Sequence, residues 1–118
     1  MDVVVTVPKS FGLQTWIDEG DAAGEQWSGQ LWAYYLQAVP DIQPGERVYI
    51  AYNGRLRGYS PLIQCKTRDL NRRAACALIR GGGAMAVTIP ERITGFMGFR
   101  YRWWDIATEI PFPEWKTP

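Results

Sequence analysis

A pattern with a period of two runs through residues 47–52, where successive side chains belong to opposite faces, as in a β-strand. The dipeptide Asn53-Gly54 follows at once, and it is typical of the two-residue turn of a β-hairpin. A second strand is therefore expected to return antiparallel to the first over residues 55–66. The polar and basic residues 67–73 then predict a loop.

Short apolar runs bounded by turn residues predict the remaining strands. The β-branched run that starts at Val3 and stops at Pro8 predicts a buried strand. The three glycines at 81–83 favour a flexible turn over a phosphate-binding loop, because no P-loop pattern surrounds them. Further strands are expected over residues 74–79, 84–89 and 98–105, before an extended tail whose Phe112 and Trp115 can pack back onto the body.

Two segments near the N-terminus have helical spacing. Ser10 is a candidate N-cap for a short helix that ends at Gly20. A second helix is expected over residues 30–38, where Tyr34 and Tyr35 share a face with other apolar side chains. The aromatic content of the same segment suits a β-strand equally well, so both structures stay open at this point.

These elements predict one domain over residues 1–118, long enough to bury a core of its own. The expected fold class is α+β and mostly β: a small barrel of five or six strands with one or two short helices near the N-terminus. No apolar run is long enough to predict a membrane span, and the first residues lack the pattern of a secretory signal. We therefore expect a cytoplasmic protein without a membrane partner.

Charge is strongly segregated along the chain although the net charge is only +1. Residues 1–46 contain one basic and seven acidic side chains, whereas residues 47–104 contain eleven basic and two acidic ones. This distribution predicts a basic face and an acidic face. The alternative is that the two regions interleave in space and pair with each other.

The composition argues against a metal centre or a cofactor. The chain has no histidine, which is the commonest general base and metal ligand. Its two cysteines, Cys65 and Cys76, lack the spacing of a zinc site. We expect them to be buried reduced thiols, with pairing across neighbouring strands as the open alternative.

Two stretches carry sequence motifs. Residues 27–52 place a Trp-Ser-Gly segment ahead of Gly-Glu-Arg-Val and an apolar strand, and residues 88–104 join Thr-Ile-Pro-Glu to Gly-Phe-Met-Gly-Phe and Trp-Trp. The first resembles the Trp-x-Gly segment, helix and Gly-Asp-x-Val strand of the PUA-like superfamily, in particular its ASCH and EVE branches. The second is similar to the Leu-Pro-x-Pro…Gly-x-x-Gly-Leu-Trp ending of many ASCH-like proteins. Glu46 departs from the family pattern, in which Asp is usual at that position.

The resemblance implies a five- or six-stranded barrel with flanking helices. It also implies binding of RNA or modified bases in a cleft between the barrel and the first helices. By the same resemblance the cleft is lined by Lys9, Trp27, Ser28, Gln30, Tyr34 and residues near Asn53 and Arg57.

The residues themselves also predict a surface that binds RNA or single-stranded DNA. Arginines neutralise phosphates, and aromatic rings stack on unpaired bases at about 1–3 kcal/mol per base. The candidate phosphate ligands are Arg55, Arg57, Arg68, Arg72, Arg73, Arg100 and Arg102, and the candidate stacking rings are Tyr52, Tyr59, Tyr101 and Trp103. Tyr49, Phe99 and Trp104 are instead assigned to the core.

Two other binding functions fit the sequence. In the first, Trp27 and Tyr34 sandwich a nucleotide or nucleobase-like ligand, and Gln30 or Asn53 reads its edge. In the second, the chain is a phage or mobile-element protein that inhibits a nucleic-acid enzyme through the acidic segment 18–25. The first predicts thermal stabilisation by a nucleotide with little salt dependence, and the second predicts loss of the partner when Asp18, Glu19 and Asp21 are neutralised.

An enzymatic function ranks last. Lys9 with Glu25 or Glu46 is the pair that a nuclease or amidohydrolase resembling the ASCH branch would use, but no local spacing supports it. No catalytic residue is assigned.

Overall fold

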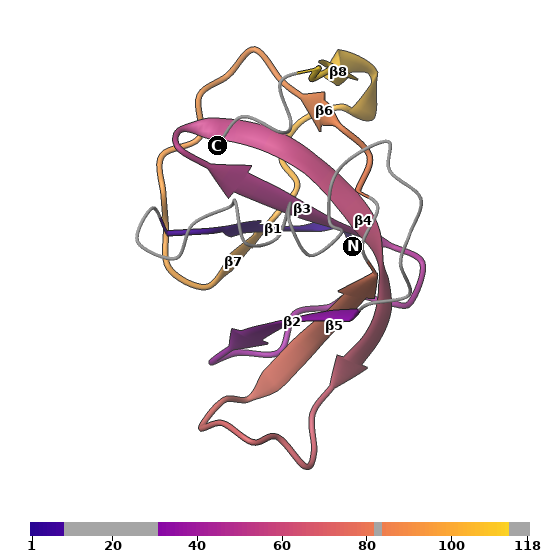
Figure 1. Ribbon diagram of the computed structural model, residues 1–118, viewed down its shortest axis with the longest axis vertical. Helices are drawn as coiled ribbons and strands as arrows, with labels where there is room; N and C mark the ends of the chain where they lie inside the picture. The colour runs from indigo at the N-terminus through magenta and orange to yellow at the C-terminus, as the bar shows by residue number, and fades with distance from the viewer. Residues whose placement is uncertain (9–30, 82–83, 114–118) are drawn as a thin grey trace.

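The computed structural model describes residues 1–8, 31–81 and 84–113 of the chain (Figure 1). These residues form eight strands and one 3-10 helix. The strands are β1 (Val3–Thr6), β2 (Leu31–Leu36), β3 (Arg47–Tyr52), β4 (Arg55–Lys66), β5 (Cys76–Gly81), β6 (Val87–Thr88), β7 (Phe99–Tyr101) and β8 (Ile110–Pro111), and the 3-10 helix is η2 (Ile106–Thr108).

Six of the strands form one mixed sheet in the order β2-β5-β4-β3-β1-β7. Strands β1 and β3 are parallel, and every other neighbouring pair in this sheet is antiparallel. Figure 1 shows that the long strand β4 curves, so that β2 and β5 lie across from β1 and β7. The sheet is therefore a half-barrel, and β6 and β8 form a separate two-stranded sheet beside it.

The hairpin between β3 and β4 is the element that the sequence predicts most sharply. Asn53 and Gly54 have φ angles of 51° and 79°, and positive values at both positions define the predicted turn type. The register of pairing shifts twice along β4. Arg57 and Ile63 are each an extra residue that lies between two residues paired with the neighbouring strand. Such bulges bend a strand and increase its twist, which accounts for the curl of β4.

The central strands β1 and β3 are buried on both faces. In β1, Val3 and Val5 belong to one core and Val4 to the other, which explains the unbroken run of β-branched residues in the sequence. The inner core, enclosed by the curl, contains Val3, Val5, Val7, Leu36, Ile42, Val48, Ile50, Leu62, Cys76 and Leu78. The outer core, on the convex face, contains Val4, Tyr49, Ala51, Leu56, Ile89, Ile93 and Trp104.

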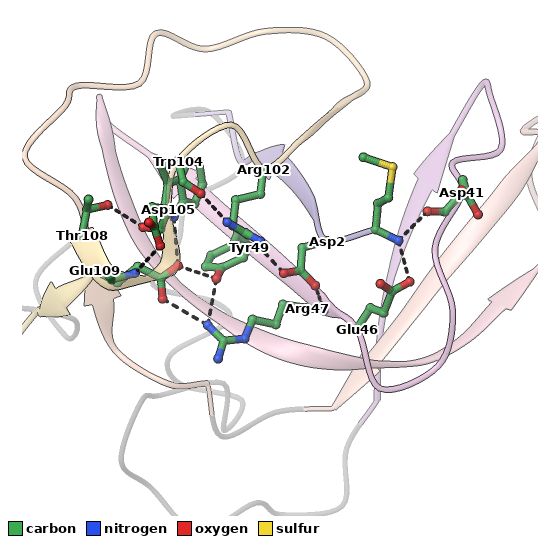
Figure 2. Close-up of polar contacts among 12 residues, drawn as sticks. Asp2, Asp41, Glu46, Arg47, Tyr49, Arg102, Trp104, Asp105, Thr108 and Glu109 are labelled. Atoms are coloured by element: carbon green, nitrogen blue, oxygen red, sulfur yellow. Dashed lines mark hydrogen bonds and ion pairs between the residues drawn. The ribbon is translucent and has the colours of Figure 1, made fainter.

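A buried carboxylate fastens the C-terminal segment to the convex face (Figure 2). The side chain of Glu109 is only 6 % exposed and lies 3.1 Å from the Arg47 guanidinium. It also accepts hydrogen bonds from the Tyr49 hydroxyl at 2.5 Å and from the Trp104 indole at 2.9 Å. Burial and the neighbouring Glu109 raise the pKa of Tyr49, so its hydroxyl stays a donor.

The predicted helix over residues 30–38 is wrong, and the alternative strand is right. Residues 31–36 form β2, in which each residue from Leu31 to Leu36 pairs with one residue of β5. Pairing and aromatic packing against the inner core outweigh the helical spacing of the same side chains. The part of the chain that the structure describes contains no α-helix, and the helix expected between Ser10 and Gly20 lies outside it.

The other predicted strands exist but are displaced or shorter. Strand β5 starts two residues later than expected, and the segment 84–89 contributes only β6 and an isolated bridge between Met85 and Tyr59. Strand β7 stops at Tyr101, after which the Arg102 side chain binds Asp2 at 3.2 Å. Phe112 packs back as expected and is 7 % exposed.

The 118-residue chain folds as a mostly β structure in the described ranges. Nowhere in residues 1–8, 31–81 and 84–113 is there a helix with the length and apolar character that crossing a membrane requires.

The Glu109 contacts generate a stability prediction. The substitution Glu109→Gln keeps the size of the side chain but removes its charge, so the ion pair with Arg47 and the charged hydrogen bonds from Tyr49 and Trp104 are weakened. We expect a loss of about 1–3 kcal/mol in the free energy of unfolding, measured by urea denaturation.

Glu91→Gln is the matched control, because Glu91 is an exposed carboxylate that also accepts a hydrogen bond from an indole, that of Trp103 at 2.8 Å. Its effect should stay within about 0.5 kcal/mol. Equal stabilities of the two variants would show that Glu109 does not hold the segment in place.

Candidate functional site

The two outer strands of the half-barrel, β2 and β7, border a groove that we call the edge groove. It has a volume of about 490 Å³ and is lined by Tyr34, Tyr35, Leu36, Gln37, Ala38, Met97, Gly98 and Phe99. A second hollow, the turn pocket, has a volume of about 400 Å³ beside the β3–β4 turn. It is lined by Thr6, Val7, Pro8, Ala51, Tyr52, Asn53, Gly54, Ile93, Gly95, Phe96 and Met97.

The curl of the sheet produces the edge groove. Tyr34 lies on β2 but packs on the inner core, and its hydroxyl donates a hydrogen bond of 2.8 Å to the Thr6 carbonyl at the end of β1. This contact holds β2 close to the opposite side of the half-barrel. Burial raises the pKa of Tyr34, so the hydroxyl remains protonated and the contact persists at neutral pH.

A basic loop stands at one end of the edge groove. We use this name for residues 66–73, which contain four basic side chains and the single acid Asp69. The Arg72 guanidinium lies 4.7 Å from the centre of the Tyr35 ring, and the Gln37 amide donates to the Arg73 carbonyl at 3.0 Å. The loop therefore touches two of the residues that line the groove.

The turn pocket also has guanidinium groups at its rim. Arg92 occupies the space beside Gly54, where a Cβ atom would lie 3.5 Å from its Nη2 atom. The Arg100 guanidinium lies 4.5 Å from the centre of the Phe96 ring. The Phe96 carbonyl in turn accepts a hydrogen bond of 2.8 Å from the Thr6 hydroxyl. Cationic and aromatic groups thus meet at this pocket as well.

The structure brings five of the predicted residues to these two hollows. Tyr34 lines the edge groove, and Arg72 stands over Tyr35 beside it. Tyr52 and Asn53 line the turn pocket, and Arg100 stands over Phe96 at its rim. In β7, Phe99 and Tyr101 pack on the inner core, whereas Arg100 pairs with Val4 of the outer core, so the rings and the guanidinium lie on opposite faces.

Other predicted residues lie on the convex face and contact the chain itself. The guanidinium groups of Arg55 and Arg57 lie 5.6 and 4.8 Å from the centre of the Phe112 ring, and Arg57 is only 5 % exposed. The Tyr59 ring is covered by Arg47, at 4.0 Å.

The remaining predicted residues are apart from these two hollows or outside the described residues. Arg102 pairs with Asp2, and Trp103, 42 % exposed, donates to Glu91. Lys9, Trp27, Ser28 and Gln30 lie outside the residues that the structure describes, as does the acidic segment 18–25.

Sequence reasoning assigned no site role to Tyr35, Met97 or Phe99. No sequence pattern pointed to Tyr35 or Met97 as candidate site residues, because each lines the groove only when β2 and β7 face each other. The basic loop was visible in the sequence as a polar and basic segment, and Arg72 was a phosphate candidate. Its position beside an aromatic groove depends on the curl of the sheet, which local patterns do not reveal.

The described residues offer no metal centre, since no three of their cysteine, aspartate and glutamate side chains are grouped to hold an ion. Cys65 and Cys76 are free thiols on neighbouring strands. Cys76 is fully buried, and its thiol donates to the Ala38 carbonyl at 3.5 Å. Burial and the nearby Cys65 raise the pKa of Cys76 to about 11.

Comparison with known proteins yields no relative: no family model, no curated protein and no solved structure matches the chain. What the structure has in common with the expected PUA-like barrel is the curled, mixed, six-stranded sheet.

The thiols generate a second prediction. Cys65 is only partly buried and lines a hollow of about 380 Å³, so iodoacetamide should alkylate it in the native protein. Cys76 is buried, and at pH 8 its thiolate fraction is about 100-fold lower than that of a thiol with the ordinary pKa of 9.0. Mass spectrometry after timed alkylation should therefore find one modified cysteine, and two after denaturation.

A Cys65→Ser variant is the control, because it should remain unmodified in the native state. Rapid alkylation of Cys76 in folded protein would contradict the packing of β5 against the inner core.

Proposed function

We propose that the protein binds single-stranded nucleic acid, RNA or DNA, with an unpaired base in the edge groove and the adjoining phosphates on the basic loop. The observation that carries this proposal is the contact between Arg72 and Tyr35, which joins a cationic loop to an aromatic-lined groove. Proteins that bind single strands combine these two features, a positively charged path for the backbone and rings on which bases stack.

The groove has the dimensions and chemistry of a ligand site. Its volume of about 490 Å³ falls within the range of about 300–1,000 Å³ that is usual for such sites. Three aromatic residues, Tyr34, Tyr35 and Phe99, are among those that line it, and Gln37 is a polar one. Every base presents a flat π-face, so stacking here favours single strands over a duplex, whose bases are already stacked.

The charges of the basic loop suit a phosphate backbone. Arg68, Arg72 and Arg73 are exposed, and only Asp69 opposes them within the loop. Each phosphate that such a loop neutralises releases counterions, so binding should weaken steeply as salt is raised. A free nucleotide held by stacking alone would show little salt dependence, which separates the small-molecule alternative from this proposal.

We also propose that the half-barrel is of the PUA-like type. The mixed six-stranded sheet and the motifs of residues 27–52 and 88–104 support this assignment. Inhibition of a nucleic-acid enzyme through the acidic segment 18–25 stays a prediction from the sequence.

The test measures fluorescence anisotropy of labelled single-stranded RNA, single-stranded DNA and duplex DNA between about 50 and 200 mM salt. We expect both single strands to bind more tightly than the duplex. Arg72→Gln should lower the affinity and reduce the slope of log affinity against log salt by about one.

Asp69→Asn is the matched control in the same loop. Asp69 has a φ angle of 55°, which asparagine also tolerates, so the loop conformation is kept while one negative charge is removed. This variant should bind more tightly. Identical affinities for the wild type and both variants, or no binding of any oligonucleotide, would overturn the proposed function.

A further inference from the structure

The edge groove and the turn pocket meet at one residue. Met97 lines both hollows and is 97 % exposed, so the two hollows adjoin at an apolar side chain that is accessible to a ligand. It is followed by Gly98, whose φ of 74° turns the chain into β7. A ligand that extends across Met97 would therefore occupy both hollows with two successive groups.

The turn pocket has a wall suited to a flat ring. Tyr52 and Phe96 contribute aromatic surface, and Ile93 and Pro8 contribute aliphatic surface. Asn53 adds an amide, which has both a donor and an acceptor and can pair with the edge of a base. A site that recognises an unstacked base usually combines aromatic rings, on which the base stacks, with a polar side chain that forms hydrogen bonds to the edge of the base.

Cationic groups lie at both ends of the path. Arg72 stands over Tyr35 at the far end of the edge groove. Arg92 and Arg100 stand at the turn pocket, beside Gly54 and over Phe96. This placement complements a ligand with negative charge on either side of its rings, as in a phosphodiester-linked strand.

We infer that the two hollows are adjacent subsites for two consecutive nucleotides of a single strand, and that Asn53 selects the base in the turn pocket. The inference rests on the proposed function and deepens it, because the edge groove then supplies stacking and the turn pocket supplies sequence preference. Met97 separates the two bases, and Arg92 and Arg100 neutralise the phosphates beside the turn pocket.

Asn53 also has a structural reason to be present, and the experiment separates the two roles. Its φ of 51° requires a residue that tolerates the left-handed region. Asn53→Gly keeps that conformation and removes only the amide. Asn53→Asp keeps the conformation and the shape but replaces the donor with a second acceptor. A purely structural asparagine would leave base preference unchanged in both variants.

The test selects bound sequences from a random single-stranded RNA hexamer pool and a matching DNA pool. Wild-type protein should prefer one base at one position of the selected sequences. Asn53→Gly should lower the ratio of affinities for the preferred base and the other bases by about 5- to 100-fold. Asn53→Asp should shift the preference toward a base that offers a donor. Tyr35→Ala, at the other subsite, should lower the affinity for every sequence and leave that preference in place.

The outcomes distinguish the two proposals. No enrichment from either pool, together with no anisotropy signal, would overturn the proposed function. Binding without any base preference, or with a preference that survives both Asn53 variants, would overturn the two-subsite inference and leave the proposed function standing. Binding of a mononucleotide as tight as that of a dinucleotide would also contradict two adjacent subsites.

Discussion

The buried carboxylate of Glu109 is the interaction on which the outer half of the structure depends. It satisfies Arg47, Tyr49 and Trp104 at once, and a buried charge is tolerated only when its partners are in place. By holding the C-terminal segment against the convex face, it positions Phe112 over the guanidinium of Arg57. The guanidinium groups of Arg55 and Arg57 on the β3–β4 hairpin therefore contact a ring of the same chain.

This arrangement leaves the open side of the half-barrel for the binding site that we propose. Two bulges in β4 curl the sheet enough to bring β2 towards β7, and the Tyr34 hydroxyl holds the two sides close. Within the described residues the two edge strands are not paired with each other, so side chains from both line a groove. The binding site that we propose is a consequence of a barrel that curls without closing.

Several features follow directly from local sequence. The turn at Asn53 and Gly54 and the buried run after Val3 come from preferences that act over a few residues. The alternation of rings with Arg100 in β7 is of the same kind. Residues 31–36 show the limit, because a helical and an extended pattern coexist there and only pairing with β5 decides between them.

The location of the candidate site was harder to predict, because it depends on contacts between distant segments. Arg57 and Tyr59 looked like surface groups beside aromatic residues, but no local pattern indicated that Phe112 and Arg47 would cover these two residues. Tyr34 and Asn53 were candidates from the sequence, and they line two hollows that meet at Met97. No short-range pattern links these positions, since the curl of β4 creates their proximity.

The central claim is that ligand binds on the open side of the half-barrel and not on the convex face. The most direct measurement is an amide NMR titration of the isotope-labelled protein with a short single-stranded RNA at low salt. The account predicts shifts confined to residues 34–38, 53–54, 68–73 and 95–100. Shifts centred on residues 55–59 and 104–112 would contradict it, because they would place the ligand on the face that Glu109 and Phe112 cover.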